Sequence, residues 1–255
     1  MFGTACQTAG MHRTDSTETY SYRIEDALNV LSVDIRRDEE GHPSFTPPFE
    51  IPIVAARGEQ IGKLIQFTVT TATTHNRIEL LTEWRNKYRQ FFLTQFEATA
   101  QRTRCWLERT ILANPARLMY FIHDHGSEPI GHLGALGLDQ RVPELDNMVR
   151  GRSGGHPQLM YWAEVALLRW LFERRGVARV SLRVLTSNWI PISIHSAIGF
   201  RIVKTEPLVR KEAAGEIHLV TGETGGEALR ARLVTMQLTA VEYAHFLQNH
   251  DQARA

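Results

Sequence analysis

A glycine-rich turn separates an extended segment from a long amphipathic helix in the middle of the sequence. The extended segment covers residues 144–149, and the turn Arg150-Gly-Arg-Ser-Gly-Gly155 leads into apolar residues at helical spacing from Gln158 to Arg175. A helix start presents unpaired backbone N–H groups and the positive end of the helix dipole, and both attract phosphate. We therefore predict a phosphate site at residues 152–159. The alternative is a plain connection, because glycines mark turns in most folds.

A second motif, Asn188-Trp-Ile-Pro-Ile-Ser-Ile-His-Ser-Ala-Ile-Gly-Phe200, follows a predicted strand at residues 177–185. The two motifs resemble the acetyl-CoA half of the GNAT acyltransferases, whose signatures are an Arg/Gln-x-x-Gly-x-Gly/Ala turn and an Asn-x-x-Ala-x-x-Leu-Tyr-x-x-x-Gly-Phe ending. Arg152-Ser-Gly-Gly155 supplies Arg-x-x-Gly, and Gly199-Phe200 match outright. Pro157 stands where the family has Gly or Ala, which leaves the register of the turn open by two or three residues.

The resemblance implies an acyl-CoA co-substrate, most simply acetyl-CoA, and no metal. In the family, the strands before and after the helix diverge, and the pantetheine arm pairs with free backbone groups in the gap. A strand N–H near Met148 or Val149 would meet the negative charge that develops on the carbonyl oxygen. The residues that the resemblance assigns to cofactor binding are Met148, Val149, Arg150, Arg152, Ser153, Gly154, Gly155, Gln158 and Asn188.

Glu144 and Asp146 are the predicted catalytic carboxylates. The acceptor in such a transfer is a primary amine, which attacks only when it is neutral, so a nearby base assists the reaction. A spacing of two residues puts both carboxylates on one face of a strand. Glu144 is the closer match to the acidic residue that the family often carries there. For Asp146, an ion pair with Arg150 on the same face is the stronger alternative.

His195 occupies the position of the family's tyrosine, which commonly protonates the departing thiolate. An imidazole with an unperturbed pKa of about 6.5 can donate a proton near neutrality, so we predict that His195 takes this role. Two alternatives remain. His195 could pack against Phe200 without a proton role, or the proton could come from water.

Trp84-Arg85-Asn86 resembles a feature of GNAT enzymes that act on amino groups of nucleotide-linked sugars, and of some polyamine and ribosomal-protein relatives. Guanidinium pairs with phosphate and aromatic rings stack, which suits a phosphorylated, ring-bearing acceptor. We predict that all three residues bind substrate, although core packing is the favoured interpretation for Trp84. His132 is a further candidate for the acceptor site or for the base. His123 and His125 belong to a turn and indicate no metal site.

The composition and net charge of the whole chain limit these functional hypotheses. Its 255 residues are 43% hydrophobic and 22% charged, as in ordinary globular proteins. A formal net charge of +1 gives no electrostatic footprint for nucleic acid or an acidic membrane. No apolar run approaches the roughly 18 residues that a membrane helix needs. We expect a cytoplasmic protein whose partner is a small-molecule amine. The oligomeric state is open, with a homodimer as one option.

Periodicity predicts the elements that position these residues. Their order predicts an α/β (α+β) protein of GNAT fold, with a mixed, mostly antiparallel central sheet flanked by helices. The predicted strands cover 29–37, 49–56, 63–71, 118–122, 129–136, 144–149, 177–185, 200–203 and 233–238, and the helices 77–84, 98–111, 158–175, from 190 onward, and 240–248, with a loop at 205–228.

We divide the chain into a flexible arm (1–22), a β-rich N-terminal extension (23–75) and a GNAT acyltransferase domain (76–255). The extension is either a small subdomain or a continuation of the main sheet. The resemblance itself covers roughly residues 65–240.

The predicted function is acyl transfer from CoA to a primary amine, with a nucleotide-linked amino sugar as the favoured acceptor. Attack would be direct, in a ternary complex, because neither Cys6 nor Cys105 has a base partner implied by its neighbours. One alternative is an amino acid, polyamine or protein amine as acceptor. Another is a non-catalytic CoA-binding module of the same fold, which the departures at Pro157 and His195 would favour.

Overall fold

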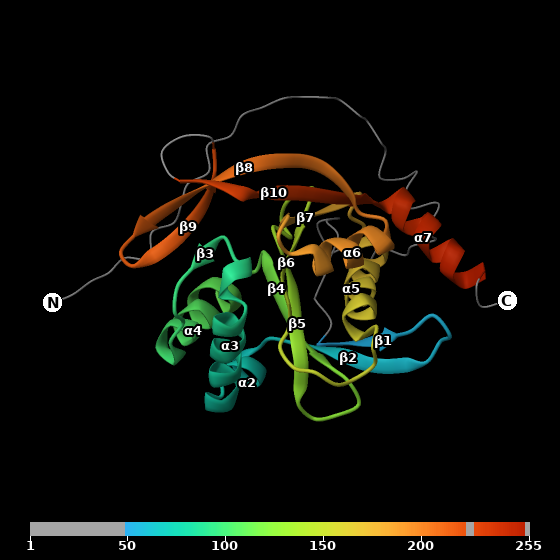
Figure 1. Cartoon of the computed structure of the whole chain (residues 1–255). Coiled ribbons are helices and arrows are strands. Elements are labelled where there is room, and N and C mark those ends of the chain that lie inside the picture. Colours follow the sequence, from blue (N-terminus) through green and yellow to red (C-terminus); the bar gives the residue numbers. More distant parts are fainter. Residues whose placement is uncertain (1–48, 223–226, 253–255) are drawn as a thin grey trace.

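The computed structural model describes residues 49–222 and 227–252, and within them ten strands form one mixed sheet (Figure 1). Every strand pairing is antiparallel except that between β6 and β7. The spatial order is β1 (Glu50–Val54), β2 (Gln60–Gln66), β4 (Arg117–His123), β5 (Pro129–Leu136), β6 (Glu144–Arg150), β7 (Arg179–Leu185), β10 (Glu227–Thr239), β8 (Arg201–Ala213), β9 (Glu216–Thr221) and β3 (Thr94–Gln95).

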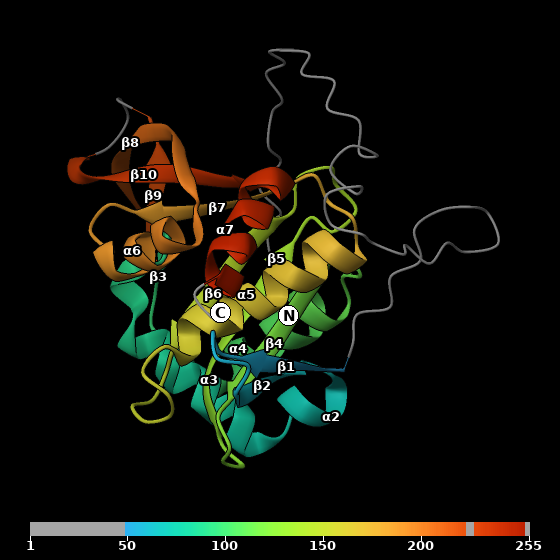
Figure 2. The same ribbon diagram turned by 90° about the vertical axis from the view of Figure 1, so that its right-hand side faces the viewer.

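Helices cover both faces of the sheet. One face carries α2 (Val69–Ala72), α3 (His75–Lys87) and α4 (Ala100–Trp106), which continues as a π-helical segment over Leu107–Leu112. The other face carries α5 (Leu159–Arg169), α6 (Trp189–Ile198) and α7 (Ala240–Gln252). Figure 2 shows α5 and α7 in front of the sheet. Two short segments complete the described helices, a 3₁₀ turn at Arg89–Phe91 and a π-helical segment at Trp170–Arg174.

Strand β4 shows why the central strands are apolar throughout. Leu118, Tyr120 and Ile122 belong to the core cluster under α5. Met119 and Phe121 alternate with them and pack with α3 and α4 on the opposite face. Because successive side chains point to opposite faces, a strand covered on both sides needs an uninterrupted apolar run.

Strands β6 and β7 separate soon after they meet. They pair in parallel only at Glu144↔Ser181 and Leu145↔Leu182. On its other edge, β6 gains one residue against β5, because the register passes from Gly134↔Asp146 to His132↔Val149. Asn147 sits in this bulge with φ of 54°, a left-handed conformation that asparagine tolerates better than most residues. The bulge and the divergence together leave backbone groups of β6 available at the gap.

The predicted fold class is confirmed, and two of the predicted segments are wrong. Residues 205–228 are not a loop, because β8, β9 and the start of β10 occupy most of that range. Residues Val69–Thr71 do not extend β2 but begin α2, since the Thr68 side chain caps the helix. Strands β1 and β2 continue the main sheet through β4. The predicted strand at 29–37 and the arm at 1–22 lie outside the described residues.

The long strands β8 and β10 reach past β7 and carry β9 to the side of the molecule where α3 and α4 lie (Figure 1). There β9 pairs with β3 at Thr94↔His218 and Gln95↔Ile217. The N–H of Leu219 also donates to the Leu93 carbonyl at 2.7 Å. This arm therefore fixes the segment that joins α3 to β3.

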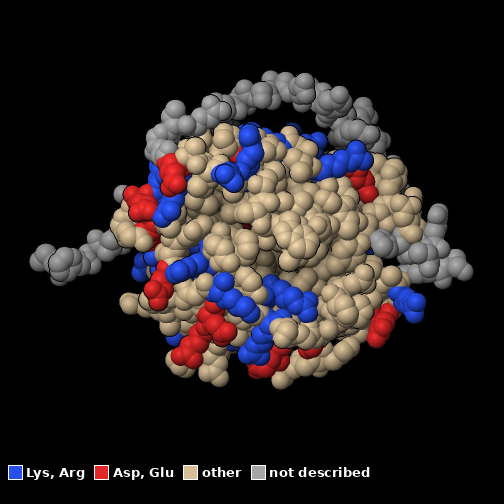
Figure 3. Space-filling view, in the orientation of Figure 1, with Lys and Arg blue, Asp and Glu red and all other residues tan. Residues whose placement is uncertain are grey.

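The surface over α6 carries few charged side chains, whereas charges gather over α3, α4 and β9 (Figure 3). Large apolar residues are exposed on α6, at Trp189 and Ile190, and on β8, at Ile202 and Val203. In the described ranges, no helix is long and apolar enough to cross a membrane.

Candidate active site

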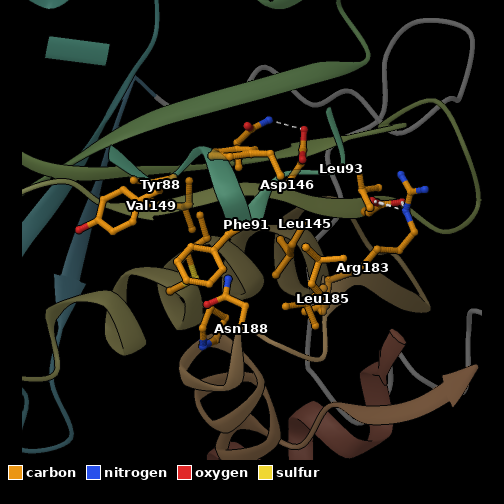
Figure 4. Close-up of a pocket in the computed structure, with 18 of the residues that line it drawn as sticks. Tyr88, Phe91, Leu93, Leu145, Asp146, Val149, Arg183, Leu185 and Asn188 are labelled. Atoms are coloured by element: carbon orange, nitrogen blue, oxygen red, sulfur yellow. Dashed lines mark hydrogen bonds and ion pairs between the residues drawn. The ribbon is translucent and has the colours of Figure 1, made fainter. Parts of the chain in front are cut away.

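A cavity of about 710 Å³ opens where β6 and β7 diverge. Its walls come from β6, β7, the start of α6 and the segment between α3 and β3. Figure 4 shows Leu145, Asp146 and Val149 of β6 along one side and Asn188, which precedes α6, on another. The cavity therefore lies between the two segments that carry the sequence motifs.

Glu144 lies in the cavity wall at the start of β6, in an ion pair with Arg183 of β7. The Arg183 Nε is 2.9 and 3.1 Å from the two carboxylate oxygens. Burial raises the pKa of Glu144, and Arg183 opposes that shift. A carboxylate of raised pKa in a cavity is suited to accept a proton, and Arg183 moderates the effect of burial on its basicity.

Asp146 also lines the cavity, but its partners are Arg117 and Asn147. The Arg117 Nη1 is 3.6 Å from the carboxylate, and Asn147 Nδ2 donates to it at 2.5 Å. Burial raises the pKa of Asp146, while Arg117 lowers it. The predicted pair with Arg150 is wrong, because the bulge at Asn147 reverses the alternation between the two positions. Arg150 instead donates to the Gly154 carbonyl at 2.5 Å.

The glycine turn leaves a run of free donors before α5. Within the described part of the chain, the backbone N–H groups of residues 153–156 have no hydrogen-bond partner. The Arg152 N–H donates to the Ile130 carbonyl, and the Gln158 N–H donates to His156 Nδ1. Gly154 and Gly155 have φ of 105° and 69°, which favours glycine at both positions. Within the predicted phosphate site at residues 152–159, the free donors are therefore the four adjacent N–H groups of residues 153–156.

Asn188 precedes α6, lines the cavity, and makes no side-chain cap bond to the helix. Met148, Val149 and Arg150 line the cavity as well. Arg152, Ser153, Gly154, Gly155 and Gln158 belong to the turn beyond its lining. The structure therefore places four of the nine predicted cofactor residues in the cavity lining and five in the turn, and their contacts with a cofactor stay a prediction.

His195 lies on α6 with its ring against Phe200, and it forms a buried pair with Glu164 of α5. The Nδ1 atom is 2.7 Å from Glu164 Oε1, and both residues line the cavity. His195 is 5% exposed and Glu164 is 0% exposed. In the described residues, neither His195 Nε2 nor Glu164 Oε2 has a hydrogen-bond partner. The packing against Phe200 and a position at the cavity are both present.

Trp84 is fully buried below the glycine turn, in the core on the α3 face, as the favoured interpretation has it. Arg85 reaches the cavity wall, but its guanidinium lies 3.6 Å from the centre of the Phe92 ring and 4.7 Å from that of Phe96. Its Nη2 donates to the Thr94 carbonyl at 2.6 Å. Burial and the nearby Arg102 lower its pKa to about 10, and Glu216 opposes them. Arg85 therefore supports the aromatic side chains at the cavity by packing against the Phe92 and Phe96 rings.

Asn86 and His132 do not line the cavity. The Asn86 side chain exchanges two hydrogen bonds with the backbone of Ala98. The His132 ring stacks on Trp84, with 5.8 Å between ring centres. Burial lowers the pKa of His132 to about 4, opposed by a hydrogen bond with the Asn147 backbone. His132 thus supports the bulge from the core side, and contact with the acceptor would require it to move.

Several residues that line the cavity were not predicted from the sequence. Glu164 interrupts the apolar face of the α5 helix between Ala163 and Leu167, and a carboxylate in that position was a readable signal of a buried pair. Arg117 and Arg183 carried no such signal, because single arginines in strands are common on exposed faces. The aromatic and apolar run Tyr88, Phe91, Phe92 and Leu93 also lines the cavity.

No protein-family model matches the sequence, and no curated protein matches it significantly. Among solved structures, the chain is similar to a probable acetyltransferase of the GNAT family from Chromobacterium violaceum, with 14% identity, a TM-score of 0.57, and coverage of 92% of this chain and 99% of that one. It is also similar to a putative acetyltransferase from T. thermophilus, with 17% identity, a TM-score of 0.57, and coverage of 83% and 100%.

A GCN5-related N-acetyltransferase from Brucella melitensis gives a TM-score of 0.57 at 13% identity, with coverage of 82% of this chain and 87% of that one. Together these likenesses show that the chain has the fold of GNAT acetyltransferases. In the described ranges, no group of three or more His, Cys, Asp or Glu residues could hold a metal ion.

Proposed function

We propose that this protein transfers an acyl group, most simply acetyl, from CoA to a primary amine. The observation that supports this best is the gap between β6 and β7, with a cavity at its mouth and four free backbone donors at the start of α5. Such donors at a helix start suit a pyrophosphate. The backbone of the bulge at Asn147 and Met148, which has no paired position in the β5 ladder, suits a pantetheine arm and the thioester carbonyl.

The reaction needs two proton transfers, one from the amine and one to the departing sulfur, and different cavity residues perform them. Glu144, or Asp146 beside it, takes the proton that the amine must lose, directly or through water. His195 delivers a proton to the sulfur when the bond from carbon to sulfur breaks. Attack is direct: Cys105 lies on α4, outside the cavity lining, and the described lining contains no cysteine. No covalent acyl-enzyme is therefore part of this proposal.

The favoured acceptor remains an amine on a ring, with a nucleotide-linked amino sugar as the first class to test. Tyr88 and Phe91 in the cavity wall support a ring, because aromatic faces stack on sugars and bases. Arg85 supports a phosphate less well than its sequence position suggested, since its guanidinium is engaged with Phe92, Phe96 and the Thr94 carbonyl. Amino acids, polyamines and protein N-termini are the competing classes.

Titration calorimetry of acetyl-CoA and a thiol-release assay with an amine library test the proposal together. We expect acetyl-CoA to bind and at least one amine class to release CoA. Binding without turnover on any amine would favour a non-catalytic module of the same fold. Absence of binding would contradict both.

In a complex with CoA, the pyrophosphate should contact the N–H groups of residues 153–156. Phosphates more than one helical turn from this segment would contradict the assignment of the turn.

A further inference from the structure

The pair formed by Glu164 and His195 is the one place in the described core where a carboxylate with no exposed surface meets an imidazole. Glu164 lies on α5, where every residue from Met160 to Leu168 except Tyr161 is also buried. Placing a charge there is costly unless it is paired and hydrogen-bonded. The sequence nevertheless puts a glutamate at this position, and the only hydrogen bond it makes in the described structure goes to His195.

We propose that Glu164 is a positioning residue that fixes the tautomer of His195 and makes Nε2 the atom that delivers the proton to the thiolate. This inference rests on the proposed acyl transfer and refines one step of it. Glu164 itself touches no reacting atom in this scheme. It acts through the imidazole.

The hydrogen-bonding capacity of the two side chains decides which atom carries the proton between them. An ionised carboxylate can only accept, so at 2.7 Å the proton between the two atoms must sit on His195 Nδ1. The reverse arrangement would need a carboxylic acid that donates to Nδ1.

The ring has only two nitrogens, so fixing one assigns the other. With Nδ1 held by Glu164, Nε2 is left, and it has no partner in the described residues while His195 lines the cavity. The ring contact with Phe200, 5.7 Å between ring centres, holds the plane of the imidazole.

In the proposed step, His195 protonates the sulfur as it leaves the carbonyl carbon. The bond from the carbonyl carbon to sulfur breaks, the electron pair goes to sulfur, and the imidazolium gives its Nε2 proton to the thiolate. The products are the amide, the CoA thiol and a neutral His195 that keeps its proton on Nδ1. Solvent returns the Nε2 proton before the next turnover.

Nitrogen NMR of the histidine-labelled protein tests the tautomer without any need for activity. The chain has 11 histidines, and a His195→Gln variant assigns the signal. We expect the wild-type ring to be protonated at Nδ1, either as that neutral tautomer or as imidazolium. A neutral ring protonated only at Nε2 would overturn the proposal, and this measurement needs no variant of Glu164.

Glu164→Gln tests the consequence. The amide of glutamine can donate to Nδ1, so the Nε2–H tautomer should appear, and kcat should fall about 10- to 100-fold while the KM for acetyl-CoA stays within about twofold. Glu173→Gln is the matched control. Glu173 lies on the π-helical segment that follows α5, paired with Arg169 at 3.5 Å and outside the cavity lining, and its variant should change neither the tautomer nor kcat.

An unchanged tautomer and an unchanged kcat in Glu164→Gln would overturn the positioning role. If the wild type releases no thiol with any amine, the proposed acyl transfer fails, and the tautomer of the wild type still decides whether Glu164 orients the ring.

Discussion

The Arg183 Nε–H is shared between the two carboxylate oxygens of Glu144, at 2.9 and 3.1 Å. The contact runs from Glu144, which is itself paired with Ser181, to Arg183, one residue beyond the last backbone pairing of β7 at Leu145↔Leu182. It therefore has two effects: it ties the strands together where they begin to diverge, and it opposes the rise in the Glu144 pKa that burial causes. A base at this position would have its proton affinity raised by burial and moderated by Arg183.

Glu144→Gln should lower kcat/KM by about 100-fold or more, the usual scale for loss of a general base. Because burial raises the pKa of Glu144, the wild-type carboxylate gains its proton as the pH falls, and its advantage over the variant disappears. The ratio of the two kcat/KM profiles isolates this effect, since titration of the acceptor amine is common to both. A ratio that does not change with pH would move the role to Asp146 or water.

Arg183→Gln removes the group that lowers the Glu144 pKa, so that pKa should rise further. The acidic limb of kcat/KM should then move to higher pH, with more activity lost at about pH 6 than at about pH 8. Arg179→Gln is the matched control, because Arg179 lies on the same strand, is exposed, and contacts Gln237 at 3.4 Å. An equal loss at both pH values would show that Arg183 acts only on the geometry of the strands.

The sequence was sufficient for the fold class because both signals behind it are local. The apolar runs of β4 and β5 and the helical spacing in α5 recur in the structure with small shifts of boundary. The sequence does not reveal strands in 205–228 because Gly215, Gly222, Gly225 and Gly226 are typical of a loop. In the structure, Leu208, Val209 and Leu219 of this stretch are nevertheless buried.

The site was predictable where one segment carries it and unpredictable where distant segments meet. Glu144, Asp146, His195 and Asn188 were all named from local motifs and all line the cavity. Arg183 and Arg117 could not be named, because their relation to the carboxylates depends on strand register.

The bulge at Asn147 was also invisible in the sequence. It accounts for the failure of the expected pairing between Asp146 and Arg150, since one extra residue reverses which face each side chain occupies.

Gly151→Ala should destabilise the protein through a clash with Trp84. A Cβ at Gly151 would lie 1.9 Å from Trp84 Cε2, and Trp84 is fully buried. Overpacking of this kind costs about 1–3 kcal/mol of unfolding free energy, and displacement of the turn should also weaken acetyl-CoA binding. Urea unfolding and calorimetry measure the two losses. The double variant with Trp84→Leu should lose less than the sum of the single losses, and strict additivity would contradict the contact.

His132 should make the folded protein less stable as the pH falls. Burial lowers its pKa to about 4, so the unfolded chain binds a proton near pH 6.5 that the folded protein refuses until about pH 4. Between about pH 7 and pH 5 this costs on the order of 2 kcal/mol. His132→Phe should remove that part of the pH dependence in urea unfolding. His75→Gln, at an exposed position on α3, should not. Equal pH dependence in wild type and His132→Phe would contradict the assignment.

His195→Ala should cost stability as well as rate, because it leaves the fully buried Glu164 carboxylate without its partner. Loss of one member of a buried pair costs about 3–5 kcal/mol. The double variant His195→Ala with Glu164→Leu removes the charge as well and should recover part of that loss in urea unfolding. Equal stability of the single and double variants would show that the carboxylate is not held as an ion.

His195→Tyr separates the proton role from this structural one. A phenol holds its proton to about pH 10, where an imidazole has already lost its own. Close to a buried carboxylate the phenol holds it longer: burial and then the charge of Glu164 raise the pKa of the neighbouring Tyr161 to about 12. The variant should therefore recover part of the kcat that His195→Ala loses, with the alkaline limb of kcat displaced to higher pH. Acetyl-CoA affinity should remain close to wild type, because a group that acts only as the bond to sulfur breaks affects kcat more than binding. If wild type and His195→Ala turn over equally between about pH 6 and 9, His195 serves packing alone, and solvent protonates the thiolate.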